Sequence, residues 1–194
     1  MLRKISKIIL GLTVAWAVAL VVGEIYKEKD YLPYFLERKG ELVSVTETRI
    51  DSPADFDVVH LLLEDARGLR IQGHLRIPRE VRPDHPALII LGGVRTGRRT
   101  IDYLGDTADW LVRALDYPSA GKKSGLGRTE LLAARPEMRR GVLDTVPAAM
   151  LAVDYLELRG DVDPDRILLA GGSLGALFSP ALAAADERVT AVAV

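Results

Sequence analysis

The chain has 194 residues, of which 48% are hydrophobic and 27% charged, which is the composition of a globular domain with its own core. The formal net charge of −1 argues against nucleic acid as a partner, and the lack of cysteine excludes disulfides, thiolate metal sites and a cysteine nucleophile. The three histidines, His60, His74 and His85, show no ligand-like spacing, so we expect neither a metal nor a cofactor.

The N-terminal segment differs from the rest of the chain. Residues 1–7 carry three basic side chains, and residues 8–23 carry no charge. Counted from Ile5, the apolar stretch is about 19 residues long, enough to cross a bilayer. The basic flank predicts a membrane anchor over residues 1–23, with the domain on the extracytoplasmic side. A signal peptide, cleaved to release a secreted protein, is the alternative, although residues 21–23 form a poor cleavage site.

Residues 24–57 are expected to link this segment to the folded domain. They mix charged side chains with several aromatic ones, which either lie at a membrane interface or belong to a short helix packed on the domain. The domain itself is expected to extend from Val58 to Val194.

From Val58 the pattern becomes that of β-structure. Two strand-like runs flank residues 64–68, and the alternation over residues 69–77 predicts a half-buried antiparallel hairpin. His74 falls on the polar side of this alternation, so we expect it at the surface. Residues 87–91 are continuously apolar, which predicts a strand buried on both faces.

Helices and strands alternate over the rest of the chain. We expect a short helix at 100–109, a strand at 110–118, a glycine-rich loop at 119–128, a helix at 136–160, a turn at 161–166, a strand at 167–171, a helix at 174–186 and a strand at 188–194. Pro147 should kink the long helix or mark its late start. This alternation predicts an α/β fold, with a mostly parallel sheet behind the antiparallel hairpin.

The stretch from Gly171 to Gly175 carries the main functional motif. Ser173 lies midway between these glycines, after a predicted buried strand and before a helix of small residues. G-x-S-x-G in this context predicts a nucleophile elbow, a strained turn that lifts the serine hydroxyl clear of the sheet. Ser173 is the candidate nucleophile, and the N–H of Leu174 is a candidate oxyanion donor at a helix N-terminus. A small polar loop is the alternative interpretation.

The loop after the strand at 87–91 is expected to supply a second oxyanion donor. Gly92 and Gly93 let the backbone bend toward the site, so the N–H of Gly93 or Val94 could point into it. A simple strand-to-helix turn would also favour glycine. The stretch nearly matches a P-loop as well, but Arg98 and Arg99 stand where the motif needs lysine and a hydroxyl residue. We therefore do not favour nucleotide hydrolysis.

Basic side chains gather in the loops that follow the predicted strands. They are Arg95, Arg98, Arg99, Lys122, Lys123 and Arg128. Ligands bind at this edge of an open α/β sheet. These side chains, Arg95, Arg98 and Lys122 above all, either form a rim that favours carboxylate-bearing substrates or are simply solvated.

The chain resembles the α/β-hydrolase superfamily over residues 58–194. The stretches GLRIQGHLRIP, PALIILGG, ALDYP and VDPDRILLAGGSLGA and the closing strand follow the order of that fold. Residues 163–176 are most similar to the branch of dienelactone-hydrolase-like, acetyl-esterase-like and prolyl-oligopeptidase-like enzymes. The resemblance implies a serine hydrolase of esterase or peptidase type, acting on a small-molecule or peptide acyl substrate through Ser173, with backbone donors at Leu174 and near Gly93. Many relatives have histidine-glycine where this chain has Gly92-Gly93.

The acid and the histidine of a catalytic triad are missing after Ser173. In this fold they follow the serine, whereas here every histidine precedes it, and Asp186 and Glu187 end the next predicted helix. The chain also stops at Val194 within an apolar run. We therefore expect a membrane-anchored serine hydrolase whose domain is C-terminally incomplete and inactive as it stands. A non-catalytic α/β-hydrolase-like binding domain is the alternative.

Overall fold

The computed structural model describes residues 30–50, 56–80, 82–93, 96–105, 109–118 and 135–194. The chain divides into two compact units, residues 1–33 and residues 34–194, and the second contains the sheet. No helix in the described ranges is both long and apolar enough to span a membrane. The anchor predicted at residues 1–23 lies outside those ranges.

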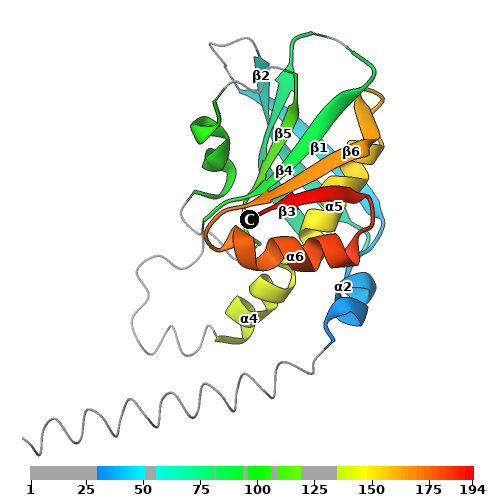
Figure 1. Ribbon diagram of the computed structural model, residues 1–194. Helices are drawn as coiled ribbons and strands as arrows, with labels where there is room; N and C mark the ends of the chain where they lie inside the picture. Colours follow the sequence, from blue (N-terminus) through cyan, green and yellow to red (C-terminus); the bar gives the residue numbers. More distant parts are fainter. Residues whose placement is uncertain (1–29, 51–55, 81, 94–95, 106–108, 119–134) are drawn as a thin grey trace, which may run out of the picture. The chain divides into compact units, whose positions relative to one another are not determined.

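The second unit is built on a sheet of seven strands (Figure 1). In spatial order they are β1 (Leu42–Ile50), β2 (Phe56–Asp65), β3 (Arg70–Pro78), β5 (Leu111–Leu115), β4 (His85–Leu91), β6 (Val162–Gly171) and β7 (Val189–Ala193). The pairs from β1 to β5 are antiparallel, and β5, β4, β6 and β7 are parallel. The sheet is therefore mixed, with an antiparallel N-terminal part and a parallel part behind it, as the sequence predicts.

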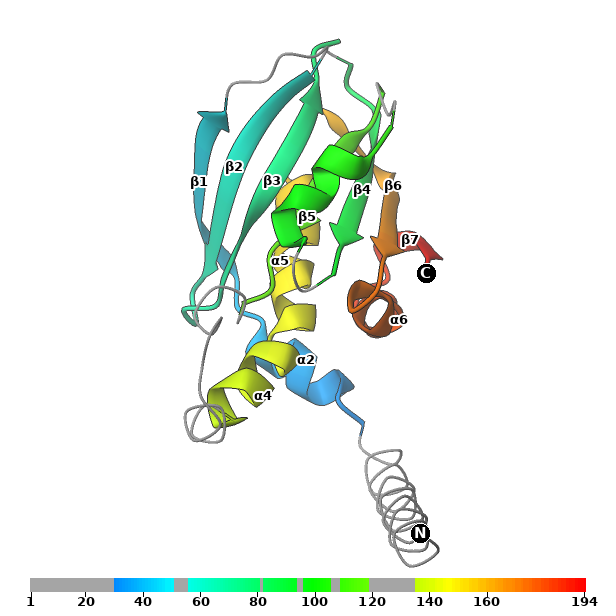
Figure 2. The ribbon, with the colours of Figure 1, turned by 90° about the vertical axis from the view of Figure 1, so that its left-hand side faces the viewer.

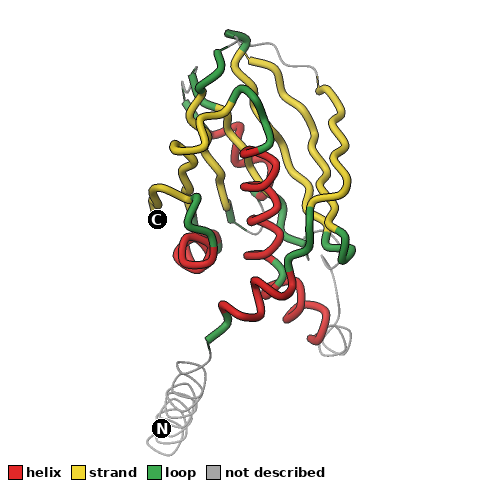
Figure 3. The backbone as a smooth tube through the Cα atoms, turned by 90° about the vertical axis from the view of Figure 1, so that its right-hand side faces the viewer, coloured by secondary structure: helices red, strands yellow, loops and turns green. Residues whose placement is uncertain are grey.

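Helices lie on both faces of this sheet. The 3-10 helix η1 (Gly97–Tyr103) packs against β3, β4 and β5 on the face turned to the viewer in Figure 2. On the opposite face, which Figure 3 shows, α5 (Thr145–Glu157) and α6 (Gly175–Ala185) contact the strands and each other. The other helices with described bounds are α2 (Leu32–Arg38) and α4 (Arg135–Leu143).

The long helix predicted at 136–160 is two helices, α4 and α5, which meet at Asp144. Pro147 lies in the first turn of α5, where its missing N–H costs no intrahelical hydrogen bond, so the prediction of a late start is confirmed. Apolar residues recur at three- and four-residue steps along this segment, and those in α5 are buried: Val146, Met150, Val153 and Leu156. Val142 in α4 is the exception, with 46% of its surface exposed.

The segment predicted as a linker, residues 24–57, contributes a strand to the sheet. β1 pairs with β2 from Leu42 to Ile50, and Arg38 of α2 forms an ion pair with Asp144 at 3.0 Å. Both faces of β1 are largely exposed, so its residues show no hydrophobic alternation. An edge strand of this kind leaves no periodic signal in the sequence, which is why the sequence does not predict β1.

Two further predictions differ from the structure at element boundaries. The turn predicted at 161–166 is the beginning of β6, where the pairing with β4 jumps from Val162 to Ile167. The residues between them bulge out of the ladder, and this bulge accommodates Pro164. The short helix predicted at 100–109 is η1, which begins and ends earlier along the chain.

Candidate active site

Ser173 occupies a strained turn between β6 and α6. Its φ is 55°, and it is the one non-glycine residue with positive φ among the described residues. Serine adopts this left-handed conformation only where the surrounding structure imposes it, and such strain concentrates at functional sites. The backbone thus has the conformation that the predicted nucleophile elbow requires.

The two glycines that flank Ser173 leave no room for a side chain. A Cβ on Gly175 would lie 1.7 Å from the carbonyl oxygen of Leu91, which ends β4. A Cβ on Gly171 would lie 2.3 Å from the hydroxyl oxygen of Ser179 and 2.7 Å from the carbonyl oxygen of Gly175. Close approach of α6 to the ends of β4 and β6 therefore requires glycine at both positions.

Main-chain hydrogen bonds attach this turn to the neighbouring strand. The N–H of Gly172 donates to the carbonyl oxygen of Leu91 at 2.9 Å, and the N–H of Gly175 donates to the carbonyl oxygen of Gly172 at 2.9 Å. Leu174 is the N-cap of α6. The first N–H groups of a helix have no acceptor within the helix, and the role of the Leu174 N–H as an oxyanion donor stays a prediction.

Gly93 lies next to the Ser173 side chain. A Cβ built on Gly93 would be 3.7 Å from the Ser173 hydroxyl oxygen. Its carbonyl oxygen accepts hydrogen bonds from the N–H groups of Thr96 and Gly97 at 3.1 and 3.0 Å, and from the Thr96 hydroxyl. These two N–H groups are therefore directed at Gly93 and not at a bound phosphate, which gives no support to the P-loop interpretation. Val94 lies outside the described residues.

Tyr117, at the end of β5, contacts this loop from within the core. Its hydroxyl donates a short hydrogen bond to the carbonyl oxygen of Gly92, and its ring packs against Phe178 of α6 with centroids 5.8 Å apart. Only 6% of Tyr117 is exposed, and this burial raises its pKa to about 12. No local pattern in the sequence predicts this contact, because Tyr117 and Gly92 are 25 residues apart.

Arg98 connects the start of η1 to Asp116 and to the hairpin. Its guanidinium forms an ion pair with Asp116 at 2.7 Å and donates to Nδ1 of His60 at 3.0 Å, and its N–H donates to Asp116 as well. The ring of His74 packs edge-on against that of His60, so His74 is half-buried rather than at the surface. Burial, and secondly the Arg98 charge, lower the pKa of both histidines.

Of the basic residues predicted on the rim, only Arg98 and Arg99 lie in the described part of the structure. Arg99 is exposed, whereas Arg95, Lys122, Lys123 and Arg128 lie outside the described residues. Arg98 already has Asp116 and His60 as partners, with 31% of its side chain exposed. Its role as a substrate contact stays a prediction.

All three histidines are described, and none is hydrogen-bonded to Ser173. His60 and His74 belong to the Arg98 cluster, and His85 is buried at the start of β4, where its ring nitrogens contact the carbonyl oxygens of Asp109 and Glu80. No group of three potential metal ligands occurs among the described residues. Among the described residues, the Ser173 hydroxyl therefore has no histidine as a hydrogen-bond partner.

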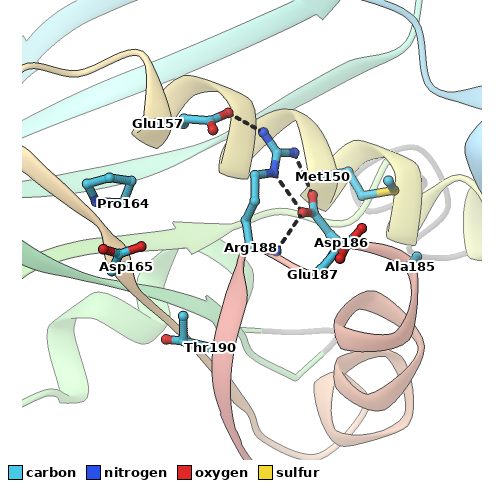
Figure 4. Close-up of a pocket in the computed structure, with 9 residues that line it drawn as sticks. All are labelled: Met150, Glu157, Pro164, Asp165, Ala185, Asp186, Glu187, Arg188 and Thr190. Atoms are coloured by element: carbon cyan, nitrogen blue, oxygen red, sulfur yellow. Dashed lines mark hydrogen bonds and ion pairs between the residues drawn. The ribbon is translucent and has the colours of Figure 1, made fainter.

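A separate hollow of about 570 Å³ lies between α5, the start of β6 and the turn from α6 to β7 (Figure 4). We call it the Arg188 hollow, after the arginine that forms ion pairs there with Asp154, Glu157 and Asp186. Ser173 is not among its lining residues. Of the carboxylates that line it, Glu157 and Asp186 form ion pairs with Arg188.

Comparison with known proteins identifies the fold. No family model and no curated protein matches the chain. Among solved structures, acetyl xylan esterase 1 from Thermoanaerobacterium sp. JW/SL YS485 matches with a TM-score of 0.61 and 20% identity, over 84% of this chain and 55% of that one. The acetyl xylan esterase from Paenibacillus sp. R4 matches with a TM-score of 0.64 and 19% identity, over 85% and 58%. A methylesterase matches with a TM-score of 0.62 and 20% identity, over 84% and 37%.

The chain therefore has the α/β-hydrolase fold, as the sequence resemblance predicts. The chain spans about half the length of the acetyl xylan esterases that it matches.

Proposed function

We propose that the protein is a serine esterase that works through an acyl-enzyme, with Ser173 as the nucleophile. The observation that carries this proposal is the left-handed conformation of Ser173 beside Gly93, held between two glycines that admit no side chain. A strained serine with main-chain N–H groups on both sides is the arrangement that acyl transfer uses. The N–H groups of Leu174 and Gly93 are the proposed oxyanion donors, and Val94 remains an alternative to Gly93.

In the proposed reaction the Ser173 hydroxyl oxygen attacks the ester carbonyl carbon while a base takes the hydroxyl proton. The resulting oxyanion is stabilised by the two N–H groups, the alcohol leaves with a proton from the base, and water then hydrolyses the acyl-serine. Since none of the three histidines contacts Ser173, we propose that the base and its acid come from outside these 194 residues. Without them the chain should be close to inactive.

The proposed substrate is a small acyl ester, and an acetyl ester on a carbohydrate is the first to test. Support comes from the acetyl xylan esterases of the same fold. A methyl ester is the second class to test, because a methylesterase shares the fold equally well. Peptide bonds are a third class that the same chemistry could hydrolyse.

The test is ester hydrolysis by the protein in the full length that its gene encodes, measured with p-nitrophenyl acetate and acetylated xylan. Ser173→Ala should lower kcat by about four orders of magnitude or more while the far-UV circular dichroism stays the same. A fluorophosphonate probe should label Ser173 in that protein and only slowly in residues 24–194. Activity that survives Ser173→Ala would refute the proposal. A folded protein without activity or labelling would favour the binding-domain alternative.

We also propose that residues 1–23 anchor the protein in a membrane, with the domain on the extracytoplasmic side. The basic N-terminal flank and the uncharged stretch after it support this orientation. Alkaline phosphatase and β-galactosidase fusions after Val194 test it, because only the first is active outside the cytoplasm. Activity of the β-galactosidase fusion alone would reverse the proposed topology.

A further inference from the structure

Tyr117 contacts both halves of the candidate site. Its hydroxyl binds the carbonyl oxygen of Gly92, directly before the candidate donor Gly93. Its ring packs on Phe178, which belongs to α6, the helix that follows Ser173. The spacing between the oxyanion donor and the nucleophile is therefore set partly by one side chain that belongs to neither segment.

Two residues that follow β5, Asp116 and Tyr117, bind the loop after β4 at two points. Tyr117 binds its first residue, Gly92, while the preceding residue, Asp116, accepts the N–H of Arg98 at 2.7 Å. A Cβ on Gly92 would come within 2.0 Å of the Thr100 hydroxyl oxygen, so this part of the loop is packed without slack. Because Tyr117 is buried and its pKa is raised to about 12, its hydroxyl remains a hydrogen-bond donor throughout the neutral range.

Because a peptide group is planar, the hydrogen bond from Tyr117 to the Gly92 carbonyl also fixes the direction of the Gly93 N–H. The carbonyl of Gly92 and the N–H of Gly93 belong to the same planar unit, and in a trans peptide they point in opposite directions. A hydrogen bond that fixes the carbonyl on the core side therefore fixes the N–H on the other side. It also polarises the peptide group, which strengthens the N–H as a donor.

We propose that Tyr117 is a positioning residue that aims the Gly93 N–H at the oxyanion formed on Ser173. This inference rests on the proposed esterase function. It differs from that function in assigning a task to a side chain that does not touch the substrate. Loss of this positioning should destabilise the transition state, in which the oxygen becomes charged, more than the bound substrate. It should therefore lower kcat more than it changes KM.

The test compares two variants that each remove one buried tyrosine hydroxyl, in the full-length protein that the gene encodes. Tyr117→Phe loses the contact with Gly92. Tyr155→Phe is the matched control. Tyr155 lies on α5 and is 5% exposed, and its hydroxyl donates to Glu47 of β1 at 2.6 Å and accepts from Arg159 at 2.6 Å. We expect Tyr117→Phe to lower kcat by about 10- to 100-fold with little change in KM, and Tyr155→Phe to leave both within about twofold.

A second measurement distinguishes a misdirected Gly93 N–H from a general loss of structure. Sulfur is a weak hydrogen-bond acceptor, so an oxyanion hole favours an ester over the corresponding thiono ester. Tyr117→Phe should reduce the preference for the ester over the thiono ester. Tyr155→Phe should leave it unchanged, because a general loss of stability lowers the rates for both substrates equally. Phe178→Leu, which loosens the support of the Tyr117 ring, should shift the preference in the same direction by a smaller factor.

The outcomes for the two proposals can be told apart. If Ser173→Ala abolishes activity while Tyr117→Phe behaves like Tyr155→Phe, the positioning role is refuted and the esterase function stands. A lowered kcat with an unchanged ester preference would likewise refute it. If Ser173→Ala keeps its activity, the function itself fails. Should Tyr117→Phe not fold, Phe178→Leu alone decides through the same preference.

Discussion

The elbow at Ser173 and the Arg188 hollow are held together by different forces. At the elbow, main chain meets main chain, and a Cβ on Gly175 would overlap the carbonyl oxygen of Leu91. In the hollow, the guanidinium of Arg188 reaches Asp154 and Asp186 at 2.7 Å and a third carboxylate on α5. Close-packed backbone admits no added atom, whereas ion-paired side chains reorient and are screened by water and salt. The candidate site is therefore fixed by shape and the hollow by charge.

The largest effect is expected from Gly175→Ala. The new methyl group would lie 1.7 Å from the Leu91 carbonyl oxygen, so α6 must move away from β4 and Ser173 must move with it. We expect a loss of about 3 kcal/mol or more in the free energy of unfolding, as for other severe overpacking. Urea denaturation of residues 34–194 measures it.

Gly172→Ala is the control for that experiment. Gly172 is also part of the elbow, but a Cβ there meets no atom within 4 Å. We expect this variant to stay within about 0.5 kcal/mol of the parent. Equal losses in the two variants would show that the elbow is sensitive for a reason other than the contact with β4.

The sequence predicts the elbow well because its determinants are local. Gly171, Ser173 and Gly175 are close in the chain, and the strand and helix around them have ordinary patterns. The contact between Tyr117 and Gly92 joins the segments that follow two different strands, β5 and β4, and no periodicity marks it. β1 was missed for a related reason: its side chains are exposed on both faces, so the pairing with β2 that makes it a strand leaves no hydrophobic pattern.

Relief of backbone strain at Ser173 should raise the free energy of unfolding, whereas Gly175→Ala lowers it. Ser173→Gly removes the side chain from a residue with φ of 55°, a conformation that costs non-glycine residues about 1–2 kcal/mol. After the added flexibility of the unfolded chain is allowed for, we expect a gain of about 1 kcal/mol in stability. Ser173→Ala keeps its Cβ and should show no such gain. A destabilised Ser173→Gly variant would mean that the serine is not strained.

The Arg98 cluster consists of Arg98, Asp116, His60 and His74. It is held by charge, like the Arg188 hollow, but it adjoins the loop that carries Gly93. The pKa values of His60 and His74 are lowered in the folded state, by burial first and then by Arg98. Below pH of about 6.5 the unfolded chain therefore binds more protons than the folded one, and stability falls as the pH drops. We expect the free energy of unfolding to decrease between pH 7 and pH 5.5. Replacing both histidines by glutamine should flatten this slope, and an unchanged slope would assign it to other groups.

An effect as small as that of Ser173→Gly is expected at the Arg188 hollow, and its salt dependence separates charge from shape. Arg188 is the partner of three carboxylates, but 30% of its side chain is exposed, so screening limits the contribution of each ion pair. We expect Arg188→Gln to lower the free energy of unfolding by about 1 kcal/mol at low salt and by less in 1 M NaCl. The loss caused by Gly175→Ala should not change with salt, because steric overlap is not screened. Equal salt responses in the two variants would remove the distinction between a region fixed by shape and one fixed by charge.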